Sequence, residues 1–263
     1  MRRSLTVLLF VLLAAILSTG SVRAGQSFVV AAASSLQHAL DELSDAFAGT
    51  GHERPRLVFG SSGNIAEQIA RGAPFELFLS ADEAYVEALL GRGSIEDDGA
   101  VYALGRLAIF VAGGSPVVAD DRLDGLRSAL DNGNVTRLAI ANPELAPYGR
   151  AAIEVLEALG ISEKARDRLV YGENVAQAAQ FAASGAADAG IIALSLAQSP
   201  GMSERGEWAA IDASLHGPLR QRMALTRKAG GEARAFFAFI LGAEGRAILE
   251  RHGFGLPSSP ESG

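Results

Sequence analysis

Two pairs of adjacent serines stand where the chain passes from a predicted strand into a predicted helix. Ser34-Ser35 follows the apolar run 29–33, and Ser61-Ser62 follows the run 57–60. The start of a helix presents backbone N–H groups without intrahelical acceptors, together with the positive end of the helix dipole. Serine hydroxyls add further donors, so such a junction can bind an oxyanion without a formal positive charge. Serine is also a common N-cap, but two pairs after successive strands favour a binding site.

The first 24 residues have the features of a secretory signal peptide. Arg2 and Arg3 form a basic start, the run 5–17 is almost wholly apolar, and the segment 22–24 offers small residues for cleavage. The apolar run is shorter than the roughly 20 residues that span a bilayer. We therefore expect cleavage after Ala24 and a protein secreted to the periplasm.

Composition excludes several classes of function. The whole chain has a net charge of −7, and loss of Arg2, Arg3 and Arg23 with the leader leaves 20 basic and 30 acidic residues, a net charge of −10. Such an acidic chain is not expected to bind nucleic acid. The chain contains no cysteine, which excludes disulfides, thiolate metal sites and a lipid-modified cysteine. Its four histidines lack metal-ligand spacing, so we expect no free-cation site and no cofactor.

Apolar runs of strand length alternate with helical patterns, which predicts an α/β fold with mainly parallel sheets. The predicted strands cover residues 28–33, 56–59, 76–80, 107–111, 137–141, 169–171, 189–193 and 220–226. The predicted helices cover residues 36–47, 65–72, 86–90, 149–159, 175–184, 232–241 and 244–251.

This order of elements predicts two lobes, each a sheet flanked by helices. We expect lobe 1 to comprise residues 25–104 and 219–257, lobe 2 residues 105–218, and a polar tail residues 258–263. Ligands of open α/β sheets lie beyond the carboxyl ends of strands. Four junctions of this kind are Ser34-Ser35, Ser61-Ser62, 147–149 and 173–175. Two belong to each lobe, so the expected site lies in the cleft between the lobes.

Several segments resemble one known family. They are 31–36 (AAASSL), 59–64 (FGSSGN), 72–82 (GAPFELFLSAD), 142–149 (NPELAPYG) and 236–254 at the end of the chain. In order and spacing they are similar to the periplasmic molybdate-binding proteins of molybdate ABC transporters, which are class II periplasmic binding proteins. The resemblance extends over residues 28–257. It implies a two-lobed binding protein, not an enzyme, that binds molybdate and also tungstate, acts with the membrane permease of an ABC importer and is a monomer.

The same resemblance assigns residues to the oxyanion site. It makes Ser35 and Ser62 hydroxyl and backbone donors in lobe 1, with Ser34 and Ser61 as supports. In lobe 2 it assigns Tyr148 and Val175, the latter through its backbone N–H. Some members use a tyrosine at the position of Ala193, whereas Tyr148 stands where others have a small residue. Whether Tyr148 binds through its hydroxyl or its backbone, or only packs at the rim of the cleft, is left open.

The sequence leaves three alternative functions. The same scaffold could select another oxyanion, such as sulfate. A periplasmic serine hydrolase using Ser62 is disfavoured because the chain has no G-x-S-x-G elbow. The effector domain of a transcriptional regulator is disfavoured by the leader and by the absence of a DNA-binding segment. We expect Asp82 to form a salt bridge or a helix cap rather than to contact the ligand.

Overall fold

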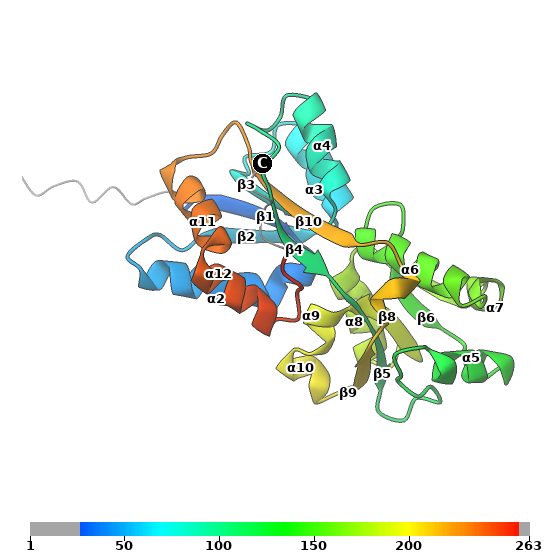
Figure 1. The fold of residues 1–263 in the computed structure, drawn as a ribbon. Coiled ribbons are helices and arrows are strands. Elements are labelled where there is room, and N and C mark those ends of the chain that lie inside the picture. Colours follow the sequence, from blue (N-terminus) through cyan, green and yellow to red (C-terminus); the bar gives the residue numbers. More distant parts are fainter. Residues whose placement is uncertain (1–26, 258–263) are drawn as a thin grey trace, which may run out of the picture.

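Two five-stranded sheets, each flanked by helices, form the framework of the protein (Figure 1). The computed structural model describes residues 27–257. The predicted signal peptide, 1–24, and the predicted polar tail, 258–263, lie outside the described residues. None of the helices within 27–257 has the length and apolar character needed to cross a bilayer.

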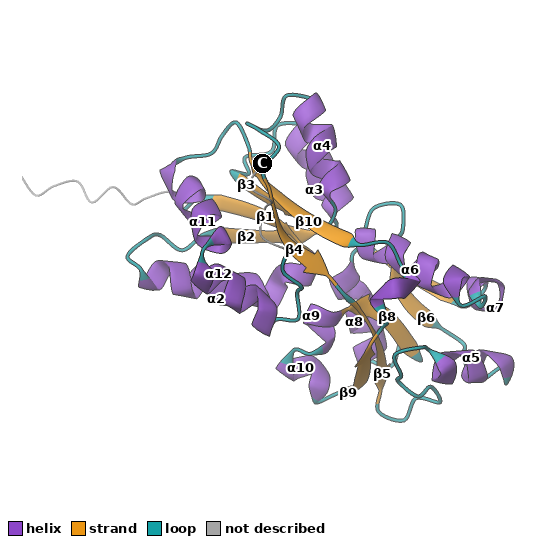
Figure 2. Ribbon diagram, viewed as in Figure 1, coloured by secondary structure: helices purple, strands orange, loops and turns teal. Residues whose placement is uncertain are grey.

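The sheet of lobe 1 has the strand order β2-β1-β3-β10-β4. Its strands are β1 (Val29–Ala33), β2 (Arg56–Gly60), β3 (Leu77–Ser80), β4 (Ala100–Gly105) and β10 (Leu219–Leu225). Its helices are η1 (Ser34–Leu36), α2 (Gln37–Gly49), α3 (Ser62–Ala70), α4 (Glu83–Gly91), α11 (Gly231–Leu241) and α12 (Ala243–Arg251). Helices cover both faces of this sheet (Figure 2).

Alternation along the central strand explains this three-layer packing. Val30 and Ala32 of β1 face α2, α11 and α12, whereas Ala31 faces α3 and α4. Successive side chains of a strand point to opposite faces, so a strand covered on both faces is apolar throughout. The four residues Val30–Ala33 are all buried, which fixes the position of the serines that follow them.

The sheet of lobe 2 has the strand order β7-β6-β8-β5-β9. Its strands are β5 (Leu107–Ala112), β6 (Leu138–Ala141), β7 (Leu169–Gly172), β8 (Ala189–Ala193) and β9 (Gly206–Ala210). Its helices are α5 (Asp124–Asp131), α6 (Pro147–Ala158), α7 (Ser162–Arg166), α8 (Val175–Ala183), α9 (Leu194–Ala197), α10 (Pro200–Ser203) and η2 (Ala213–Leu215). One continuous apolar core unites these elements.

The predicted two-lobed α/β fold is confirmed, and each sheet is mixed, with one of its five strands running against the other four. In lobe 1, β1 runs parallel to β2 and β3, but β10 runs antiparallel to β3 and β4. In lobe 2, β6 runs parallel to β7 and β8, but β5 runs antiparallel to β8 and β9. The antiparallel strands β10 and β5 are those that the chain enters directly after crossing from the other lobe, so they run opposite to the strands of the local βαβ units.

The chain passes between the sheets twice. β4 ends at Gly105 and β5 begins at Leu107; β9 ends at Ala210 and β10 begins at Leu219. The predicted division of the chain at 104/105 and 218/219 remains a proposal.

The predicted strands and helices agree with the structure to within a few residues at each end. Sequence patterns missed β4, β9, α5 and the short helices α7, α9 and α10. β9 is an edge strand with exposed Glu207 and Trp208, so it lacks the apolar run that marks a buried strand.

Gly149 permits α6 to begin directly against the end of β6. A Cβ atom at this position would lie 2.3 Å from the Ala141 carbonyl oxygen and 2.8 Å from the Pro143 nitrogen. Because these neighbours are backbone atoms, Gly149→Ala should lower the free energy of unfolding by about 1–3 kcal/mol. Urea denaturation measures this, with Gly91→Ala as the control, since a Cβ at Gly91 meets nothing within 4 Å. Equal stability of the two variants would contradict the packing described.

Candidate functional site

Strand register brings the four predicted junctions to the edges at which the two sheets meet. In lobe 1, Ala33 of β1 pairs with Gly60 of β2, so both serine pairs leave the sheet side by side. In lobe 2, Ala141 of β6 pairs with Gly172 of β7, so the loops leading to Tyr148 and Val175 also leave one edge together. The carboxyl ends of parallel strands thus gather the predicted site residues of each lobe.

Hydrogen bonds between the lobes connect the first serine pair to lobe 2. Ser34 Oγ accepts a hydrogen bond from Ala176 N at 3.3 Å. The backbone oxygen of Ser35 accepts one from Ser195 Oγ at 2.7 Å. These contacts place η1 of lobe 1 directly against α8 and α9 of lobe 2.

The second serine pair lies at the start of α3. Ser61 is the N-cap of this helix, and its side chain accepts a hydrogen bond from Asn64 N at 3.4 Å. Ser62 is fully buried, and its hydroxyl accepts a hydrogen bond from Ala81 N at 3.0 Å. Ser61 therefore supports the local structure, while the Ser62 proton remains available to another acceptor.

Ser35 is the least satisfied of the predicted donors. Its side chain is 1% exposed, and within the described part of the chain its hydroxyl oxygen has no hydrogen-bond partner. It lies near enough to the Tyr148 hydroxyl to favour the ionised form of that phenol. A buried hydroxyl without a partner costs about 1–3 kcal/mol, so this atom is suited to a ligand.

Tyr148 lies inside the interlobe region, not at its rim. It is 2% exposed, and its hydroxyl accepts a hydrogen bond from Nε2 of Gln221 at 2.9 Å. Burial raises the pKa of Tyr148 to about 12, although the nearby Ser35 hydroxyl and the hydrogen bond from Gln221 oppose the shift. Its predicted role as a ligand donor, through the hydroxyl or the backbone, stays a prediction. At neutral pH its hydroxyl is protonated and can donate.

Helix starts add backbone donors to these hydroxyls. Val175 is the first residue of α8 and is buried; Asn174, the N-cap, accepts from the next two N–H groups, those of Ala176 and Gln177. The first N–H groups of an α-helix have no intrahelical acceptor. Ser62 is the first residue of α3 and Tyr148 is the second of α6, so their N–H groups are also candidate donors.

The site hydroxyls share one property. Those of Ser34, Ser62 and Tyr148 each accept a hydrogen bond from an N–H group, while Ser35 has no partner. Among residues 27–257, none of the four donates its own proton to a protein acceptor. Accepting bonds from the protein leaves the protons free for a ligand that only accepts. An oxyanion has this chemistry.

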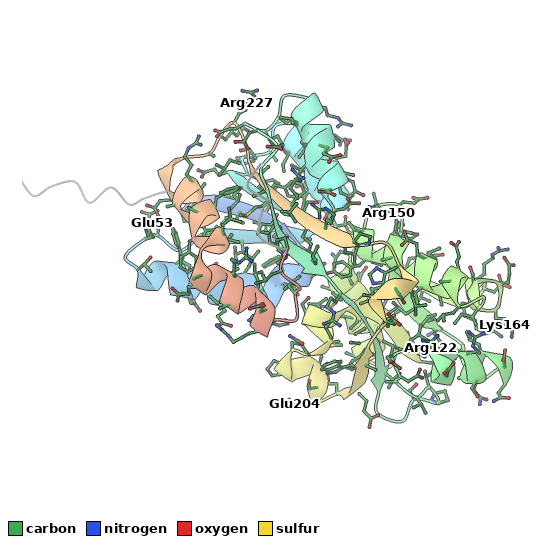
Figure 3. All side chains as sticks on the ribbon, in the orientation of Figure 1. Glu53, Arg122, Arg150, Lys164, Glu204 and Arg227 are labelled. Atoms are coloured by element: carbon green, nitrogen blue, oxygen red, sulfur yellow. The ribbon has the colours of Figure 1, made fainter. Side chains whose placement is uncertain are left out.

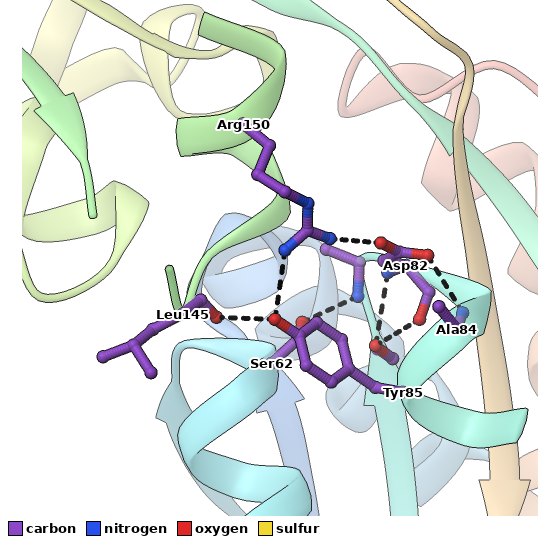
Figure 4. Close-up of polar contacts among 8 residues, drawn as sticks. Ser62, Asp82, Ala84, Tyr85, Leu145 and Arg150 are labelled. Carbon is purple, nitrogen blue, oxygen red and sulfur yellow. Dashed lines mark hydrogen bonds and ion pairs between the residues drawn. The ribbon is translucent and has the colours of Figure 1, made fainter. Parts of the chain in front are cut away.

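An ion pair links the two lobes near the second serine pair (Figure 4). Arg150, on α6 at the boundary between the lobes (Figure 3), forms an ion pair with Asp82 and donates to the Tyr85 hydroxyl at 3.1 Å. Burial acts to lower the pKa of Arg150, but Tyr85 and Asp82 stabilise the charged form and the net shift is upward. Alongside this pair, Gly63 N donates to the Leu145 oxygen at 3.0 Å.

Asp82 also caps α4 by accepting a hydrogen bond from Ala84 N at 2.9 Å. Its predicted role as a salt-bridge or cap residue is confirmed on both counts.

The sequence analysis did not predict two residues of the site, Ser195 and Gln221. Ser195 lies two positions after Ala193, where the family pattern places a tyrosine in some members, and it supplies a hydroxyl to the Ser35 carbonyl instead. Gln221 is a fully buried glutamine in a predicted strand, and its polar side chain at an apolar position was the available signal.

The geometry does not fit a serine hydrolase. No histidine or carboxylate among the described residues bonds to the hydroxyl of Ser35 or Ser62. His52 and His252 contact Glu232 and Glu42 instead, and His216 contacts the Gly217 carbonyl. Within residues 27–257, no three His, Asp or Glu side chains gather into a group that could hold a metal ion.

Comparison with known proteins agrees with this geometry. The family of bacterial extracellular solute-binding proteins matches residues 28–255. The molybdate-binding protein ModA of Azotobacter vinelandii is 35% identical over 79% of this chain and 81% of its own length. ModA of Rhodobacter capsulatus is 36% identical over 78% of each chain. The solved structure of the Azotobacter vinelandii periplasmic molybdate-binding protein superposes with a TM-score of 0.80 and 32% identity, covering 88% of this chain and 100% of that one.

These relatives are molybdate-binding proteins, so the expectation that the chain is not an enzyme is confirmed. Together, the family match over nearly all described residues, the identity to two ModA proteins and the shared two-lobed fold show that the chain belongs to the bacterial extracellular solute-binding proteins and, among them, to the periplasmic molybdate-binding proteins.

Proposed function

We propose that the protein is a periplasmic receptor that binds molybdate between its two lobes and delivers it to the permease of an ABC importer. Tungstate has the same charge and tetrahedral shape and should bind at the same site. The receptor acts as a monomer. Ser35, Ser62, Tyr148 and Val175 provide the donors, with Ser34 and Ser61 as supports.

The observation that carries the proposal is the set of hydroxyl protons without protein acceptors. Ser35 Oγ is buried and unpartnered among the described residues. Ser62 and Tyr148 accept bonds from Ala81 N and Gln221 Nε2, and their protons are free to point into the site. A molybdate dianion has only acceptor oxygens and would satisfy all of them.

The strength of these bonds is sufficient for tight binding. A hydrogen bond to a charged group contributes about 1.5–3 kcal/mol. About six such bonds would contribute roughly 9–18 kcal/mol before the costs of desolvating the dianion and closing the lobes. Submicromolar affinity needs a little more than about 8 kcal/mol net, so at the upper end of the range nearly 10 kcal/mol can offset these costs.

Neutral donors would also let the site distinguish molybdate from other anions. The nearby cation, Arg150, is paired with Asp82, so its charge is not free to attract every anion. Dipoles fixed at helix starts select an anion by radius and protonation state. Sulfate, the alternative ligand, is smaller and should leave some of these bonds long. Competition titration separates the two: sulfate displacing molybdate at equal concentration would favour the alternative.

Removing a single donor should weaken binding without unfolding the protein. Ser35→Ala and Ser62→Ala are each expected to lower molybdate affinity by about 1.5–3 kcal/mol, or about 10- to 150-fold, because each loses one bond to a charged group. Isothermal titration calorimetry measures this. Ser44→Ala is the matched control, since Ser44 is buried but donates to Leu40 O within α2. Wild-type affinity in both site variants would remove these serines from the site.

Molybdate affinity should hardly change between pH 6 and pH 9. None of the proposed donors is a His, Lys or carboxyl group, and the pKa of Tyr148 is raised to about 12 by burial. The neutral phenol donates, so affinity should fall only as the pH approaches that value and a phenolate, which repels the anion, forms. Titrations in buffers across this range test it. A tenfold change centred near pH 6.5 would instead implicate a histidine.

A further inference from the structure

Three buried side chains form a polar chain across the two lobes. Gln221 of β10 is fully buried; its Nε2 donates to the Tyr148 hydroxyl at 2.9 Å, and its Oε1 accepts from the Tyr102 hydroxyl at 2.9 Å. Tyr102 of β4 is 1% exposed and also lies 3.2 Å from the Ser80 oxygen. An amide nitrogen only donates and an amide oxygen only accepts. The donor end of Gln221 therefore faces Tyr148.

This arrangement determines where the Tyr148 proton can go. The amide hydrogen of Gln221 occupies a lone pair of the phenol oxygen, so the phenol O–H bond must point elsewhere. Ser35, which has no hydrogen-bond partner among the described residues, lies close to the same hydroxyl. The proton is thereby directed into the interlobe site.

The backbone leaves room for these three hydrogen-bonded side chains. The pairing of β10 with β4 shifts register between Gln221 and Arg222, because Tyr102 is an extra residue between the paired Val101 and Ala103. Such bulges redirect side chains and occur often beside functional sites. Gly105 leaves the necessary space, since a Cβ there would lie 2.7 Å from both Gln221 Nε2 and the Tyr148 hydroxyl.

We propose that Gln221 is a positioning residue which, held by Tyr102, turns the Tyr148 hydroxyl proton toward the bound oxyanion. The inference rests on the proposed function and adds a residue that contacts the anion only through Tyr148. Because Gln221 and Tyr148 belong to different lobes, this orientation is established only when the lobes are closed.

A double-mutant cycle measured by molybdate titration tests the inference. Gln221→Met should weaken binding about tenfold or more when Tyr148 is present, because the proton is no longer directed. In the Tyr148→Phe background the same change should weaken binding less than about twofold, because there is no proton left to orient. Gln198→Met is the matched control: it removes another glutamine bond between the lobes, from Gln198 Nε2 to the Arg251 oxygen, and should leave affinity unchanged.

A second variant reverses the polarity while keeping the shape. In Gln221→Glu, the introduced carboxyl is buried, so its pKa should rise above about 4.3. Protonated, it can donate to Tyr148 as the amide does; ionised, it takes the Tyr148 proton away from the anion. Affinity should therefore fall as the pH rises through that pKa, whereas the wild type stays level. The fall should be smaller in the Tyr148→Phe background, where only charge repulsion remains.

The outcomes separate the inference from the proposed function. Equal losses from Gln221→Met with and without the Tyr148 hydroxyl would make Gln221 merely structural and overturn the inference. Full affinity in Tyr148→Phe would overturn it too, since the hydroxyl would not be a ligand, yet molybdate binding by the wild type would still stand. A wild type that binds no molybdate would overturn the proposed function and the inference together. Thermal melting of each variant confirms that it is folded.

Discussion

Buried donors need acceptors, and the region between the lobes contains more hydrogen-bond donors than the protein satisfies by itself. Leaving a buried polar group unpaired costs about 1–3 kcal/mol. Ser35 Oγ has no partner within residues 27–257, and the hydroxyls of Ser62 and Tyr148 accept bonds but donate none there. The region between the lobes thus holds hydroxyl protons that have no protein acceptor among the described residues. A ligand that only accepts hydrogen bonds resolves this imbalance, and the bonds between the lobes hold the donors around it.

Strand pairing in the two sheets brings these donors together, although they lie far apart in the sequence. Pairing of Ala33 with Gly60 and of Ala141 with Gly172 brings two helix starts together in each lobe. The mixed topology has a second effect: β10, which enters lobe 1 from lobe 2, runs antiparallel beside β4 and brings Gln221 opposite Tyr148. The same strand that joins the lobes therefore contributes to the polar chain that links them. Arg150 of α6 and Asp82, the N-cap of α4, add an ion pair between the lobes.

Much of this could be predicted from sequence, and the exceptions have a common cause. Serine pairs after apolar runs are local features, so the junctions at Ser34-Ser35 and Ser61-Ser62 and most element bounds were found. The antiparallel direction of β10 and β5 could not be predicted, because it depends on how the chain crosses between the lobes. Ser195 and Gln221 bond to partners 160 and 73 residues away, and no local pattern encodes such pairs. The edge strand β9 was missed because its exposed Glu207 and Trp208 break the apolar signal.

Diffraction from crystals grown with molybdate, collected at the molybdenum absorption edge, tests the central claim most directly. The account predicts one strong anomalous peak between the lobes, with anion oxygens within about 3.2 Å of Ser35 Oγ, Ser62 Oγ, the Tyr148 hydroxyl and Val175 N. A peak at another place, such as the groove of about 670 Å³ that Gln37, Phe181 and Met202 help to line, would contradict it. So would a fully occupied anion held by lysine or arginine side chains instead of hydroxyl and backbone donors.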